Sequence, residues 1–195
     1  SNVAREIVSD TSVFLRERRS GLRLFAYFGS IFSYQFLLAT IQTLMIAVLV
    51  HLFVGLSTPL PVIWGILLLT SSCGISLGLL VSSISRTEVM AISLIPLLLF
   101  PQLLLGGYIK LYGMMQISGW QHWLADCMPI RWSFESLILF EYSSFLEVNE
   151  NLRSLAEIIG FSHTKQFYSI SALSLFLLVC SLLTILVLQR KSTKK

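Results

Sequence analysis

The acidic and histidine side chains that could support catalysis or bind a metal gather in residues 122–163. His122 and Asp126 are four positions apart and would share one face of a helix, where Glu135 or His163 could complete a metal site. Zinc sites usually show tighter His, Cys or Glu patterns, and no His-Glu-x-x-His segment is present. We therefore predict no catalytic residue and no metal site in this chain.

Two of these carboxylates, Glu135 and Glu141, lie in an apolar run that we expect in the outer leaflet of a membrane. A buried carboxylate needs a partner, and Arg131 precedes Glu135 by one helical turn. This spacing favours a re-entrant helix pinned by an Arg131–Glu135 ion pair. The alternative is a polar element near an exit path.

The elements that must position these residues are strongly apolar. Of 195 residues only 12% are charged, and residues 24–85 contain no Lys, Arg, Asp or Glu. Pro59 and Pro61 divide this run, because proline stops a helix, and a span needs about 20 residues. We predict an all-α membrane protein, a helical transmembrane bundle with spans at about 34–56, 62–85, 89–108 and 166–189.

The remaining segments set the orientation. Residues 1–23 are predicted to form an amphipathic helix at the cytoplasmic surface, or else a solvated helix. Residues 110–165 form an outer loop with re-entrant helices, and 190–195 a basic cytoplasmic tail. With both termini cytoplasmic, ten of the fourteen Lys and Arg residues fall on the cytoplasmic side, which is the positive-inside pattern.

Single residues within the spans allow further expectations. Gly74 and Gly78 are four positions apart and would let another helix approach closely. Pro96 and Pro101 indicate either a helix that lines a cavity or a kink that packing tolerates. His51 is expected to be a hydrogen-bonded structural residue, with a proton relay as the alternative. Cys127 is expected to be a free, packed thiol, with a bridge to a second copy as the alternative.

Two segments resemble the membrane domain of ABC exporters of the white/G-subfamily type, the ABC-2-type permease. That family has a connecting helix reading roughly Glu-Arg-x-x-Phe-x-Arg-Glu-x-x-x-Gly and an outer segment reading roughly Pro-x-Arg-Tyr-x-x-Glu-Ala-Leu-x-x-Asn-Glu-Phe. Here Thr11 departs from the first pattern and Phe140 from the second. The matching positions are Phe14, Arg16, Glu17, Gly21, Pro129, Arg131, Glu135, Leu137 and Glu141.

The resemblance implies the C-terminal part of a permease with six spans, whose first two spans and nucleotide-binding domain lie upstream. The implied partners are that domain, fused or separate, a second permease half, identical or different, and the lipid bilayer, with no nucleic acid. ATP and Mg²⁺ are implied on the nucleotide-binding domain, no cofactor on this chain, and no enzymatic activity of the chain by itself. The implied function is export of a hydrophobic or amphipathic substrate by alternating access, in a plasma or bacterial inner membrane.

The resemblance also implies three groups of functional residues. Contact with the ATPase is expected at Phe14, Arg16, Glu17, Arg18, Arg86 and Glu88. The substrate cavity is expected at Gln42, Phe100, Leu103, Leu104 and Tyr108. The re-entrant motif comprises Pro129, Arg131, Glu135 and Glu141. Two alternatives stay open: an ATP-independent four-helix channel or scaffold, and an intramembrane lipid enzyme that uses Glu135, His122 and Asp126.

Overall fold

The computed structural model describes residues 3, 24–85, 87–106, 124–144 and 163–193. In this part of the chain the regular structure is entirely helical, in five helices: α3 Leu24–Val54, α4 Leu60–Ile84, α5 Glu88–Leu105, α7 Pro129–Ser144 and α9 His163–Thr193. Four candidate membrane spans coincide with α3, α4, α5 and residues 167–191 of α9. The protein is therefore a helical membrane bundle, as the sequence predicts.

Local signals explain the helix ends. Gly55 stops α3 with φ +68°, a conformation that glycine adopts without strain. Pro59 and Pro61 begin α4, because the first turn of a helix needs no backbone N–H. The Thr87 hydroxyl accepts a hydrogen bond from the Met90 N–H at 3.3 Å and caps α5. Helix α3 begins at Leu24 and so extends the predicted span 34–56 toward the N-terminus.

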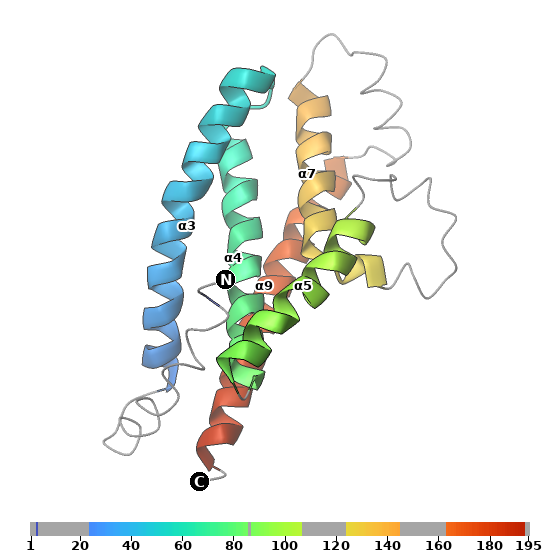
Figure 1. The fold of residues 1–195 in the computed structure, drawn as a ribbon. Helices are drawn as coiled ribbons and strands as arrows, with labels where there is room; N and C mark the ends of the chain where they lie inside the picture. The colour runs from blue at the N-terminus through green and yellow to red at the C-terminus, as the bar shows by residue number, and fades with distance from the viewer. Residues whose placement is uncertain (1–2, 4–23, 86, 107–123, 145–162, 194–195) are drawn as a thin grey trace.

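Helix α4 is the centre of the bundle and contacts α3, α5, α7 and α9 (Figure 1). It runs parallel to α9, since the Cys73 thiol donates to the Leu173 carbonyl and the Lys191 amine to the Ser85 carbonyl, each at 3.3 Å. It runs antiparallel to α7, since Thr70 bonds Ser133 whereas Thr58, just before α4, bonds Glu141 later in α7. We call the end at residues 55–59 the loop end and the end at residues 85–87 the turn end.

Serines, rather than glycines, provide the close packing of α4. Ser76, Ser82 and Ser83 have no exposed surface, whereas a Cβ added to Gly74 would meet nothing within 4 Å. The hydroxyls of Ser76 and Ser83 donate to carbonyls one turn earlier in their own helix. They are thereby satisfied without a partner from another helix. Within the described part of the chain no helix packs closely against Gly74, because the neighbouring helices of α4 pack on the serine face.

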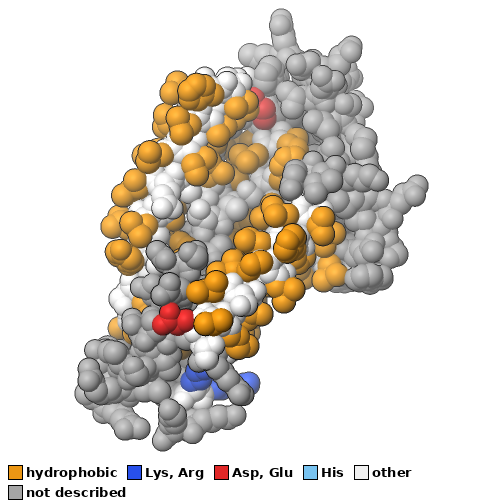
Figure 2. Space-filling model, in the orientation of Figure 1, with side chains coloured by type: hydrophobic (Ala, Val, Ile, Leu, Met, Phe, Trp, Pro, Cys, Tyr) orange, Lys and Arg blue, Asp and Glu red, His pale blue; other side chains and the backbone are white. Residues whose placement is uncertain are grey.

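Hydrophobic side chains cover the outward faces of α3 and α5 (Figure 2). Leu37 on α3 is 61% exposed and Leu97 on α5 is 67% exposed. Exposed apolar surface of this extent is what a helix presents to lipid tails. The predicted helix within residues 1–23 and the predicted re-entrant helix at 117–124 lie outside the described residues, apart from Val3 and Leu124.

Candidate functional site

Helix α7 carries a buried arginine between two carboxylates. The predicted ion pair is present: Nη2 of Arg131 lies 3.7 Å from Oε2 of Glu135, and Nη1 of Arg131 also binds Oδ1 of Asp126. The Arg131 side chain is 9% exposed and its guanidinium lies 4.2 Å from the centre of the Trp132 ring. Trp132 in turn donates to the Asp126 carbonyl at 2.8 Å. Asp126 is therefore held to the start of α7 by both Arg131 and Trp132.

The depth of α7 follows from its partners on α4. Ser133 bonds Thr70 at 2.7 Å, and Glu141 bonds Thr58 just before α4 begins. Thr70 lies about 15 Å along the helix axis from Leu60, at 1.5 Å per residue. Helix α7 therefore runs beside the loop-end half of α4, a length of about half a hydrocarbon core.

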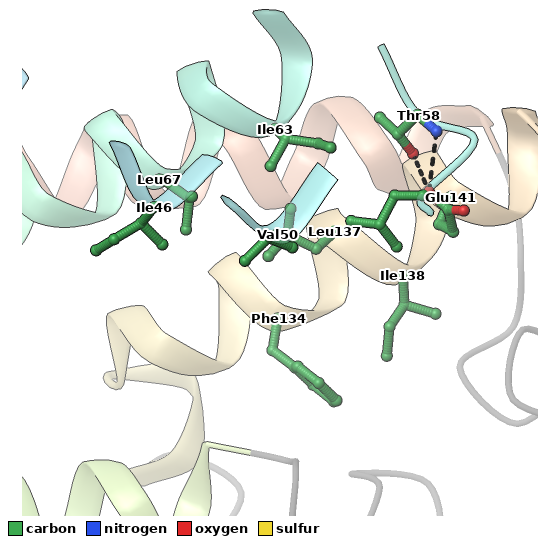
Figure 3. Close-up of a pocket in the computed structure, with 10 residues that line it drawn as sticks. Ile46, Val50, Thr58, Ile63, Leu67, Phe134, Leu137, Ile138 and Glu141 are labelled. Atoms are coloured by element: carbon green, nitrogen blue, oxygen red, sulfur yellow. Dashed lines mark hydrogen bonds between the residues drawn. The ribbon is translucent and has the colours of Figure 1, made fainter. Parts of the chain in front are cut away.

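Glu141 joins α7 to the loop between α3 and α4. The Ser57 N–H donates to Oε1 of Glu141 at 2.7 Å. The Thr58 N–H donates to Oε2 at 3.0 Å, and the Thr58 hydroxyl donates to Oε2 as well (Figure 3). Glu141 is only 8% exposed. Sequence reasoning missed this partner. The available signal was the pair of backbone N–H groups at Ser57 and Thr58, which lie in the loop before α4 and need acceptors from elsewhere in the protein.

A cavity of about 310 Å³ lies beside this contact, between α3, α4 and α7. We call it the loop-end cavity. Thr58 and Glu141 lie at one end of it and Ile46 and Leu67 at the other (Figure 3). The lining residues are Ile46, Val50, Leu56, Thr58, Ile63, Leu67, Phe134, Leu137, Ile138 and Glu141. Apart from its Thr58–Glu141 end, the cavity is apolar.

The predicted substrate-cavity residues lie elsewhere. Gln42 is exposed on α3, and Phe100, Leu103 and Leu104 are exposed on α5, at 66%, 44% and 59%. None of them lines the loop-end cavity or the smaller cavity of about 120 Å³ between α4 and α5. Tyr108 lies outside the described residues.

At the turn end, the structure describes part of the predicted ATPase contact. Glu88 is the first residue of α5, directly after the Thr87 cap. An acidic side chain at this position interacts favourably with the helix dipole. The amine of Lys191 on α9 holds the Ser85 carbonyl, a contact that the sequence did not suggest. Phe14, Arg16, Glu17, Arg18 and Arg86 lie outside the described residues.

Neither metal nor nucleophilic chemistry is assembled in the described ranges. Within them no three His, Cys, Asp or Glu side chains could hold a metal ion, while His122 and the side chain of His163 lie outside them. Residues 74–78 read Gly-Ile-Ser-Leu-Gly, the spacing of a hydrolase nucleophile elbow, which requires a strand–turn–helix. Here Ser76 is buried inside α4 and donates to the Cys73 carbonyl at 2.9 Å, so it is not an exposed nucleophile.

Two single residues complete the comparison with the sequence. The Nδ1 atom of His51 is buried with no hydrogen-bond partner among the described residues, so the expected structural bond is not seen at that atom. Cys127 is a free thiol, but it is exposed, so the expectation that it is packed is wrong. Cys73 and Cys180 are free and buried.

The junction of α5 and α7 allows a direct test of packing. A Cβ added to Gly106 would lie 2.5 Å from the Gln102 carbonyl oxygen and 2.9 Å from Cγ2 of Ile130. We expect Gly106→Ala to destabilise the protein by about 1–3 kcal/mol, because one of these groups must shift. Thermal unfolding in detergent measures the change. In the control Gly65→Ala nothing lies within 4 Å, and the added methyl group should be neutral or stabilise α4. Equal effects of the two changes would contradict this packing.

Comparison with known proteins adds a family assignment to this geometry. The family model described as ABC-2 type transporter matches residues 1–142. No curated protein matches the chain.

Proposed function

The chain belongs to the ABC-2 type transporter family, and from this membership we propose that it is the C-terminal part of the permease of an ATP-driven exporter of the white/G-subfamily type. Membership makes the chain an integral membrane protein and a permease component of an ABC-type transporter. The proposal adds the direction of transport, the subfamily and the place of the chain within the whole permease. It further takes both termini to be cytoplasmic, in a plasma or bacterial inner membrane.

One observation carries the subfamily proposal. Helix α7 begins with Pro129, runs beside the loop-end half of α4, and carries Arg131, Glu135 and Glu141 at the spacing of the family's outer segment. All three charged side chains are engaged in contacts within the protein. This supports a re-entrant element with a structural role.

Helix α5 is the proposed wall of the substrate path. It contains Pro96 and Pro101, and only Ala91 and Gln102 of its side chains are buried. A helix with so little packing against its own bundle can move at low cost during alternating access. The exposed side chains of Phe100, Leu103 and Leu104 would then meet a hydrophobic or amphipathic substrate.

ABC-2 membrane proteins normally work with an ATP-binding component. We place that component at the turn end, against the segment of Phe14 to Arg18 and the turn of Arg86 to Glu88. A second permease half, identical or different, would complete the substrate path. ATP and Mg²⁺ belong on the ATP-binding component.

The two alternatives are weaker. An intramembrane lipid enzyme would need Glu135 and Asp126 as acid and base, yet both carboxylates bind Arg131. An ATP-independent channel or scaffold does not require an ATP-binding partner. Family membership favours such a partner, and so argues against this alternative.

Substitution of Arg16 or Glu17 by alanine in the whole transporter tests the proposal. Each change removes one charge from the proposed contact with the ATP-binding component. Loss of a close charge pair there should reduce transport about tenfold or more while ATP hydrolysis continues. ATPase rate and efflux of a panel of fluorescent hydrophobic dyes, both from proteoliposomes, measure the two activities. Arg153→Ala, on the proposed outer side, is the matched control. Unchanged coupling in both Arg16 and Glu17 variants counts against the exporter.

A further inference from the structure

The loop-end cavity has the polarity of a site for an amphiphile. Its body is lined by aliphatic and aromatic side chains, such as Val50 on α3 and Leu137 on α7. Its polar groups lie together at one end, at Glu141 and Thr58 (Figure 3). At about 310 Å³ it has the size of a small ligand pocket.

Among the described residues, only neutral hydrogen-bond donors contact the carboxylate at the polar end. The donors to the Glu141 carboxylate are the Ser57 and Thr58 N–H groups and the Thr58 hydroxyl, all of them neutral. In the parts of the chain that the structure describes, no Lys, Arg or His side chain pairs with it. A carboxylate offers about four acceptor positions. One position therefore remains for a further donor, and a cationic donor would offset the cost of the buried anion.

The position of the cavity matches that of a lipid chain. Leu67 lies about 10 Å along α4 from Leu60, at 1.5 Å per residue. The cavity thus extends from the loop end into the apolar part of the bundle, parallel to α3 and α4. Its polar end faces the level where lipid head groups meet the hydrocarbon core.

We infer that the loop-end cavity binds a bilayer lipid with an ammonium head group. The ammonium group donates to Glu141, and one acyl chain lies along Val50 and Leu137 toward Leu67. A neutral amphiphile would fill the same apolar volume but leave the carboxylate without a counter-charge. This site is separate from the proposed substrate path on α5, and the inference does not depend on the direction of transport.

Native mass spectrometry of the whole purified protein tests the inference with two probes. Dioleoylphosphatidylethanolamine has the ammonium group, and its N-acetyl derivative has the same chains without it. Wild-type protein should bind the first about tenfold more tightly, the equivalent of one charge-assisted hydrogen bond. Glu141→Gln, which keeps an acceptor oxygen for the loop, should lose this preference.

A cavity-filling pair locates the binding. Val50→Phe adds volume inside the cavity and should abolish retention of both lipids. Leu49→Phe, on the adjacent residue that is 51% exposed and does not line the cavity, should bind as the wild type does.

Three results would overturn the inference. Equal retention of the two lipids by the wild type would exclude recognition of the head group. Unchanged binding by Val50→Phe would place the lipid elsewhere. A lower melting temperature of Val50→Phe with unchanged lipid retention would indicate that a protein segment occupies the cavity.

Discussion

Arg131→Leu is expected to lower the free energy of unfolding by about 3–5 kcal/mol, the cost of breaking a buried ion pair from one side. Arg131 is 7% exposed and pairs with both Asp126 and Glu135. Leucine keeps the apolar contacts of the side-chain stem but leaves two carboxylates without this cation. Thermal or chemical unfolding in mixed micelles, followed by tryptophan fluorescence, measures the loss.

The two carboxylates provide graded controls for this result. The Asp126 side chain is 44% exposed and the Glu135 side chain 15%, so water compensates the first more fully. Asp126→Asn should therefore cost about 1 kcal/mol or less, as for a surface pair, and Glu135→Gln more. Replacing Arg131 and Glu135 together by leucine should recover part of the loss, because an apolar pair needs no counter-charge. Equal costs for Asp126→Asn and Arg131→Leu would show that burial does not set the strength of this cluster.

The sequence predicted those structural features that depend on residues close together in the chain. A run of residues 24–85 without charge is stable in an apolar solvent, and Pro59 and Pro61 favour a helix start at this place. The Arg131–Glu135 pair follows from the one-turn spacing on a helix. In each case residues close in sequence determine the outcome, so the sequence contains the required information.

The contact of Glu141 with the α3–α4 loop could not be predicted in this way. It joins residues 83 and 84 positions apart and depends on α7 running antiparallel to α4. Helix packing inside a membrane is not driven by burial of apolar surface, because lipid tails are equally apolar. The order and direction of neighbouring helices therefore leave little trace in the hydropathy pattern.

The same physics explains why the cavity residues were not found. Lipid-facing and cavity-facing positions are both apolar, so Phe100 on α5 and Val50 on α3 look alike in sequence. The structure separates them: Val50 lines the loop-end cavity, whereas Phe100 is 66% exposed and lines neither cavity described above. Gly74 did not indicate a close helix contact within the described chain for a related reason. Small residues permit close approach without requiring it, and the serines of α4 permit it equally.

Glu141→Ala is expected to have the second large effect on stability, about 2–4 kcal/mol, because three donors lose their acceptor at once. The loss should be local in origin. The Ser57 and Thr58 N–H groups lie ahead of Pro59, outside any helical hydrogen-bond ladder, and Glu141 supplies their acceptor. Hydrogen exchange of the Ser57 and Thr58 amides should therefore accelerate, and the melting temperature should fall.

A double-mutant cycle separates this contact from general damage. Thr58→Val removes the hydroxyl donor to Glu141, and Thr40→Val removes a hydroxyl that bonds the Phe36 carbonyl in its own helix. The cycle of Glu141→Ala with Thr58→Val should show a coupling of about 0.5–3 kcal/mol. The cycle with Thr40→Val should show none. Additive effects in both cycles, with unchanged exchange at the Ser57 and Thr58 amides, would mean that Glu141 does not hold the loop. Coupling confined to Thr58 would instead show that one carboxylate on α7 attaches the α3–α4 loop to this helix.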